Sequence, residues 1–184
     1  ESDELTVERR LVAENAPTLT VHEDVVLFAW NGTLFSLDLA TGKQLWQKGK
    51  FSQGDYRSPA SVLVLDGLVW DMNITNKRED GRLTGFDPRT GEEKRTFAPK
   101  GPFKGMGHHR CYRCRATKKY VIASRSGVEL VDPVKEEWRE HFFVRGACLY
   151  GVMPANGMIY STPHPCACYI KSKLNGYCAL GPRR

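Results

Sequence analysis

A sequence pattern that occurs twice constrains the fold of this chain more than any other feature. Residues 32–38 and residues 81–87 both read Gly-x-Leu-x-x-x-Asp, and in both copies Thr-Gly follows after two further residues. Matching residues lie 49 positions apart. A repeat of this period predicts an array of small structural units, and the short apolar run before each Asp indicates that the units contain β-strands.

The residues after each strand predict a tight turn. The carboxylates of Asp38 and Asp87 are suited to accept hydrogen bonds from backbone amides a few residues further on. Gly42 and Gly91 tolerate the positive φ that such turns require. Pro88 fixes φ at the first turn position of the second copy. Each copy is therefore expected to be a strand, a turn and a second strand.

The longer pattern Gly-x-Leu-x-x-x-Asp-x-x-Thr-Gly-x-x-x-Trp resembles the blade repeat of quinoprotein-like (PQQ-like) β-propellers. The first copy matches through Trp46, whereas the second copy has Arg95 at that position. The resemblance implies that Trp46 packs between neighbouring blades and has a structural role.

Two weaker echoes of the same unit follow, at residues 120–132 and 146–180, and Trp138 is expected to close the first of them. We therefore predict an all-β chain of about four antiparallel blades, a small or partial β-propeller. Residues 1–184 are interpreted as one propeller unit, with plain blades in 1–100 and Cys/His-rich blades and loops in 101–184. Another copy or a larger parent chain is a possible means of completing the propeller.

Composition narrows the class of partner and the compartment. The net charge is +6, which fits an acidic polysaccharide or a protein partner. No basic run interleaved with aromatic residues and no groove-binding helix is predicted, so nucleic acid is not expected. No apolar stretch approaches the ~20 residues of a membrane helix. The six cysteines favour an oxidising compartment, so the chain is predicted to be extracytoplasmic, either periplasmic or secreted.

All six cysteines and four of the five histidines lie after residue 100. Two segments there, residues 107–114 and 145–169, resemble large, secreted, multidomain bacterial PQQ-like repeat proteins. The resemblance implies no established reaction. It leaves Cys114 and Cys178 outside the shared pattern, which suggests that these two form a disulfide of their own.

The cysteines allow two interpretations. They can be disulfides that hold long loops together. They can also join with histidines in a zinc or copper site, because thiolate and imidazole are the ligands that these metals prefer. The candidate metal ligands are His108, His109, Cys111, Cys114, His164, Cys166 and Cys168.

A catalytic interpretation rests on four neighbouring residues. His108 or His109 could act as a base, Tyr112 as an acid, and Arg113 could neutralise a substrate carboxylate during β-elimination on an acidic glycan. The resemblance to quinoproteins also raises the question of a quinone cofactor. The chain has no adjacent cysteine pair of the kind that quinone-dependent dehydrogenases place beside the quinone, so a quinone is not expected.

The sequence thus favours a non-catalytic extracytoplasmic scaffold or binding module that presents a Cys/His-rich loop face, formed by residues 107–115 and 145–169. A lyase-like enzyme and a metal-binding or redox module are the alternatives.

Overall fold

The computed structural model describes most of the chain as β-strands joined by short turns. The described residues are 18–51, 60–73, 82–98, 113–123, 127–141, 144–148, 150–163, 174 and 176–182. Their strands form four separate antiparallel sheets, three of four strands and one of three. Within these ranges there is no helix, and hence none long and apolar enough to span a membrane.

Each sheet is a meander in which neighbouring strands follow one another in the sequence. The first sheet contains β1 (Thr18–His22), β2 (Val25–Trp30), β3 (Thr33–Asp38) and β4 (Gln44–Gly49). The second contains β5 (Leu63–Leu65), β6 (Leu68–Asn73), β7 (Arg82–Phe86) and β8 (Glu93–Phe97). The third contains β9 (Arg115–Ala116), β10 (Val121–Ala123), β11 (Val128–Asp132) and β12 (Glu137–His141). The fourth contains β13 (Met153–Ala155), β14 (Met158–Ser161) and β15 (Cys178–Leu180).

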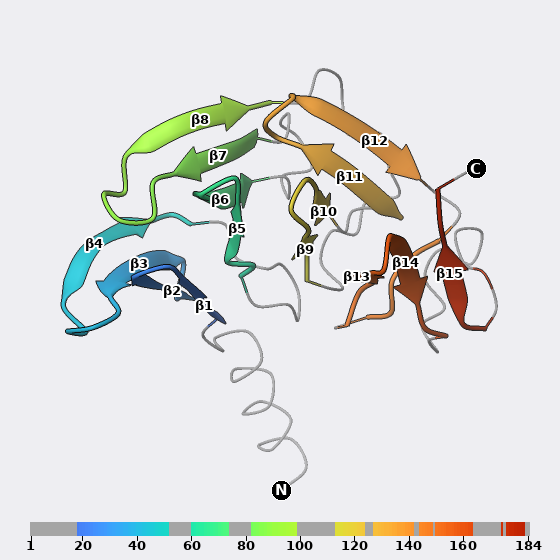
Figure 1. Ribbon diagram of the computed structural model, residues 1–184, viewed down its shortest axis with the longest axis horizontal. Coiled ribbons are helices and arrows are strands. Elements are labelled where there is room, and N and C mark those ends of the chain that lie inside the picture. The colour runs from blue at the N-terminus through green and yellow to red at the C-terminus, as the bar shows by residue number, and fades with distance from the viewer. Residues whose placement is uncertain are drawn as a thin grey trace, which may run out of the picture.

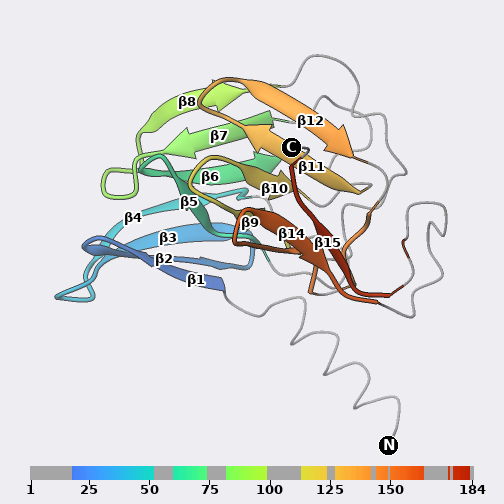
Figure 2. The ribbon, with the colours of Figure 1, turned by 45° about the vertical axis from the view of Figure 1, so that its right-hand side comes forward.

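The four sheets follow one another around an arc (Figure 1). The strands β4, β8 and β12 lie on its outer side, and β1, β5, β9 and β13 lie toward the inside. The turned view in Figure 2 shows the same succession, with the first and fourth sheets at the two ends of the arc. The predicted fold class, antiparallel blades of a small or partial propeller, is confirmed.

Apolar side chains fill the space between successive sheets, because each strand alternates its side chains between two faces. Between the first and second sheets, Leu27 and Leu34 pack in the same buried cluster as Val69 and Phe86. Between the second and third, Trp70 and Leu83 share a cluster with Val121 and Val131. The cluster that joins the third and fourth sheets is smaller, with Ile122, Val128 and Val152 as its buried members.

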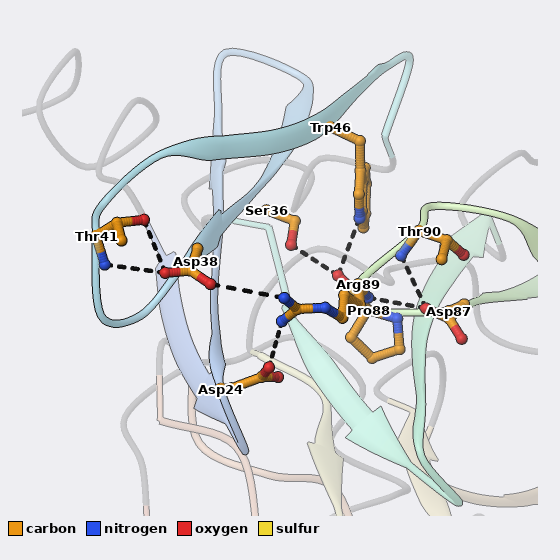
Figure 3. A network of polar contacts seen from close by, with 9 residues as sticks. All are labelled: Asp24, Ser36, Asp38, Thr41, Trp46, Asp87, Pro88, Arg89 and Thr90. Atoms are coloured by element: carbon orange, nitrogen blue, oxygen red, sulfur yellow. Dashed lines mark hydrogen bonds and ion pairs between the residues drawn. The ribbon is translucent and has the colours of Figure 1, made fainter.

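The indole of Trp46 fixes the first sheet to the second. Its Nε1 donates a hydrogen bond to the carbonyl oxygen of Pro88 at 2.9 Å, and the hydroxyl of Ser36 donates to the same oxygen at 2.7 Å (Figure 3). The ring also lies against the turn glycine, since a Cβ on Gly91 would meet a Trp46 ring carbon at 2.8 Å. The resemblance therefore predicted correctly that Trp46 packs between blades.

Arg89 adds ion pairs across the contact between the first and second sheets, here called the first joint. Its guanidinium contacts the carboxylates of Asp24 and Asp38, the latter at 3.7 Å (Figure 3). The side chains of Arg89 and Asp24 are both more than half exposed. Exposed pairs of this kind contribute about 0–1 kcal/mol. Apolar packing, in the shared cluster and around the indole, thus contributes more to the stability of this joint than the ion pairs do.

The two later joints lack the indole. Arg95 replaces it on β8, and its guanidinium lies 4.0 Å from the Asp66 carboxylate of its own sheet. Trp138 does not take the role predicted for it. It pairs with Val131 and packs against the cluster between the second and third sheets, so it faces the preceding sheet, whereas Trp46 faces the following one.

The two turn glycines provide a matched pair of variants. Gly42 and Gly91 have φ of 70° and 73°, so an alanine at either position costs about 1–2 kcal/mol of backbone strain. A Cβ at residue 42 would meet nothing within 4 Å, whereas one at residue 91 would meet the Trp46 ring. We expect Gly91→Ala to lower the free energy of unfolding by about 1–3 kcal/mol more than Gly42→Ala does. Urea denaturation measures the difference, and equal losses would contradict the assigned role of Trp46.

The turn carboxylates predict how stability depends on pH. A hydrogen bond from the Thr41 hydroxyl, at 2.8 Å, and one from the Thr41 amide lower the pKa of Asp38 below its ordinary 3.8. The Thr90 amide, at 2.8 Å, is the main cause of the lowered pKa of Asp87. Because the folded pKa values are depressed, this stabilisation is complete above the unfolded pKa and is lost as the pH falls through the folded values.

We therefore expect the double variant Asp38→Asn, Asp87→Asn to lose less stability than the parent on acidification below about pH 4. Asparagine keeps an oxygen acceptor for the turn but does not titrate, so the turn conformation is retained. Urea midpoints measured from about pH 2 to pH 6 test this. Parallel curves for the parent and the variant would contradict it.

Candidate binding site

Most of the residues that the sequence singled out lie outside the described residues. These are His108, His109, Cys111, Tyr112, His164, Cys166 and Cys168. The metal hypothesis and the catalytic hypothesis therefore both stay predictions. In the part of the chain that the structure describes, no three His, Cys, Asp or Glu side chains group as metal ligands.

Arg113 and Cys114 are described, and they enter the third sheet just before β9. Both are partly buried, and the amide of Cys114 donates to the hydroxyl of Ser61 at 3.3 Å, close to β5. Burial and the neighbouring Arg115 guanidinium lower the pKa of Arg113. The Arg115 guanidinium donates to the carbonyl oxygen of Tyr150 at 3.0 Å, which links the third sheet to the chain that leads into the fourth.

The predicted disulfide between Cys114 and Cys178 is wrong. Cys178 at the start of β15 has a free thiol, with its sulfur 3.9 Å from the carbonyl oxygen of Gly176. The idea rested only on these two cysteines being extra to the family pattern, and no spatial constraint brought them together.

A cavity of about 970 Å³ opens between the third and fourth sheets, at the joint with the smallest buried cluster. Its wall on the third sheet is formed by Ile122, Val128 and Leu130. Its wall on the fourth sheet includes Pro154, Met158 and Ile159, with Leu180 from β15. The cavity is therefore bounded largely by apolar side chains.

Strand register explains why basic groups meet this apolar wall. Leu130 pairs with Arg139, and Val128 pairs with His141, so all four side chains project from the face of the third sheet that is turned toward the fourth. Val131 projects from the opposite face, into the core shared with the second sheet.

Lys118 and Lys119 in the turn before β10 add two more basic groups to the lining, which includes no Asp or Glu. The ammonium of Lys119 lies 4.9 Å from the centre of the Tyr120 ring. A hydrogen bond with Tyr120 is the main cause of the raised pKa of Lys119. Lys119 thus keeps its positive charge at neutral pH, and its side chain and that of Arg139 form an exposed basic rim of the lining.

The cavity occupies the place that an indole would fill at the first joint. Trp46 pairs with Ser36 on β3, and Arg139 is paired in the same way with Leu130 on β11. An exposed arginine therefore lies at the position that Trp46 has in the first sheet, and at this joint the buried cluster is also the smallest of the three. The substitution is visible in the sequence, but only after the strands have been aligned in register.

Sequence reasoning located part of this site. The hairpin Pro154-Ala155-Asn156-Gly157 belongs to the segment 145–169 that was expected to form a loop face, and it lines the cavity. Lys118, Lys119 and Arg139 were not predicted as site residues, because their position at the cavity depends on which side chains of β11 and β12 share a face.

Comparison with known proteins finds a partial match to a quinoprotein. No protein-family model matches the chain. A segment of 101 residues is 34% identical to quinohemoprotein alcohol dehydrogenase from Comamonas testosteroni, and it covers 48% of this chain but 14% of that enzyme. The chain thus spans a small part of this curated relative.

Two solved structures share the fold. The computationally designed protein Ika4 superposes with a TM-score of 0.55 at 15% identity, over 91% of this chain and 93% of Ika4. BamB from Moraxella catarrhalis superposes with a TM-score of 0.51 at 20% identity, over 88% of this chain and 46% of BamB. At these identities the likeness concerns the arrangement of the sheets.

Proposed function

We propose that this chain, whose repeats resemble those of PQQ-like β-propellers, is a non-catalytic, extracytoplasmic binding module. Its site is the cavity between the third and fourth sheets. Its ligand is a molecule with an apolar body and an acidic group, such as a long-chain carboxylic acid or an acidic lipid.

One observation carries this proposal: the cavity joins apolar walls to a rim of basic side chains, with no acidic residue in its lining. An apolar ligand body would displace water from Leu130 and Ile159, at about 25 cal/mol for each Å² removed from water. The acidic group would meet Lys119 or Arg139 at the rim, where charge-assisted hydrogen bonds are roughly twice as strong as neutral ones.

The polysaccharide considered from net charge fits this cavity less well than an amphipathic acid does. A sugar chain needs polar partners for its hydroxyl groups. Apart from the basic side chains and His141, the lining offers only Thr117, Tyr120 and Asn156 as polar side chains. The third-sheet wall presents Ile122, Val128 and Leu130 instead. An extracytoplasmic location is supported by the cysteine content and by the resemblance to secreted repeat proteins.

The proposal is tested with cis-parinaric acid, a long-chain carboxylic acid that becomes fluorescent in apolar sites, and with its uncharged methyl ester. We expect the acid to bind and the double variant Lys119→Gln, Arg139→Gln to weaken its binding about tenfold, which is about 1.4 kcal/mol. Binding of the ester should be little changed, because only the charge at the rim is removed. The affinity for the acid should also fall as salt is added.

Lys135→Gln provides the matched control, since Lys135 carries the same charge on the exposed turn after β11 and does not line the cavity. Leu130→Trp, which places an indole in the cavity, should abolish binding of both probes. The proposal is contradicted if neither probe binds, or if the control variant weakens binding of the acid as much as the double variant does.

A further inference from the structure

The outer face of the first sheet is apolar, and none of the other three sheets covers it in the part of the chain that the structure describes. Strand register places Leu19 beside Phe28 and Phe35, and Val21 beside Val26 and Leu37, all on the face turned away from the second sheet. Trp30 continues the same face at the end of β2. Leu19, Val21 and Trp30 are 63%, 53% and 51% exposed, and the rings of Phe28 and Phe35 stack with their centres 4.6 Å apart.

The equivalent face of the second sheet packs against the preceding sheet. Alignment of their first hairpins makes Val64 and Val69 the counterparts of Val21 and Val26, and alignment of the Asp turns makes Phe86 the counterpart of Leu37. Val69 and Phe86 are 0% and 2% exposed, because they pack in the cluster shared with the first sheet. The first sheet therefore repeats the surface that receives a preceding sheet.

The turn of the first sheet also repeats the place where an indole packs at the first joint, here called the indole seat: a turn glycine and a backbone carbonyl three residues before it. At the first joint Trp46 lies against Gly91 and donates to the carbonyl oxygen of Pro88 (Figure 3). Gly42 and Leu39 are their counterparts, since they follow Asp38 at the same distances at which Gly91 and Pro88 follow Asp87. A Cβ on Gly42 would meet nothing within 4 Å, and Leu39 is 48% exposed.

The joint between the second and third sheets acts as an internal comparison. Arg95 replaces the indole there, and Glu136 replaces the turn glycine with φ of 57°. A non-glycine residue can thus adopt this turn conformation, and it does so where no indole arrives. The turn glycine and the indole are present together at one joint and absent together at the next, so Gly42 marks a seat for an indole.

We propose that the outer face of the first sheet docks a further blade of the same repeat, whose outer strand brings a Trp against Gly42 and the carbonyl oxygen of Leu39. A second copy of this chain does not meet that requirement with its described residues. Trp46 is already seated, Trp70 is fully buried and Trp138 packs into a core. Trp30 belongs to the docking face itself.

The test extends the natural chain by a blade that carries the required Trp. A second copy of residues 20–62, which includes Trp46, is inserted between Leu19 and Thr20, so that the inserted sheet precedes the original first sheet. Gly42→Ala is then made in the original sheet of both the natural and the extended chain. Unfolding equilibria and acrylamide quenching of Trp30 are compared between the two.

In the extended chain, Gly42→Ala should lower the folding equilibrium constant about tenfold more than it does in the natural chain, because the Cβ now meets a seated ring. Acrylamide should quench the original Trp30 less in the extended chain. The signal of this residue is obtained by subtracting the fluorescence of a Trp30→Phe variant of the same chain. Replacing the inserted copy of Trp46 by Ala should restore the smaller effect of Gly42→Ala, whereas the same replacement at the exposed Gln47 of the inserted copy should not.

Two results would overturn the proposal. One is an equal effect of Gly42→Ala in both chains with unchanged quenching of Trp30, including the case in which the inserted sheet does not fold. The other is self-association of the natural chain in sedimentation equilibrium that Val21→Glu abolishes, which would make a second copy the occupant of this face. A natural chain that sediments as a monomer, together with the expected Gly42→Ala result, supports the proposal.

Discussion

The packing of each sheet against the next is the constraint on which the rest of this structure depends. A four-stranded sheet has two faces, and on the first three sheets of this chain both faces carry apolar residues, so one neighbour is not enough. Each large apolar side chain buried between sheets contributes about 1.5–3 kcal/mol. The surface ion pairs of Arg89 contribute about 0–1 kcal/mol and do not determine the arrangement.

The joints differ in the residue on the outer strand and in the size of the apolar core between the sheets. A rigid indole closes the first joint, with a hydrogen bond and a glycine to accommodate it. The second joint has Arg95 on the rim and retains a large core that includes Trp70 and Phe97. The third joint has Arg139, a small core and a cavity of about 970 Å³. Arginine replaces the indole at both later joints, and a cavity lined by that arginine accompanies the small core of the third.

Local chemistry made the sheets predictable from the sequence. The Asp turns at residues 38 and 87 specify their own hydrogen bonds with Thr41 and Thr90, so the repeat and the strand–turn–strand units could be recognised without tertiary information. The orientation of Trp138 could not be predicted from the sequence alone. Trp138 pairs with Val131, whereas Trp46 pairs with Ser36, whose equivalent in the third sheet is Leu130. The two tryptophans are therefore one position apart in register, and a shift of one position in a strand moves a side chain to the other face. The cavity was missed for the same reason, since it depends on which residues of β11 and β12 share a face.

The same argument separates the two ends of the arc. The fourth sheet has three described strands and meets the third across a cavity, so its joint can accept a small molecule without disturbing a large core. The first sheet has four strands, a continuous apolar face and an open seat at Gly42, which are the features of a surface built to receive another sheet. A cavity with basic groups at its rim selects a ligand by charge, whereas a flat face with one indole seat selects a partner by shape. The proposed ligand site and the proposed docking face therefore lie at opposite ends of the array.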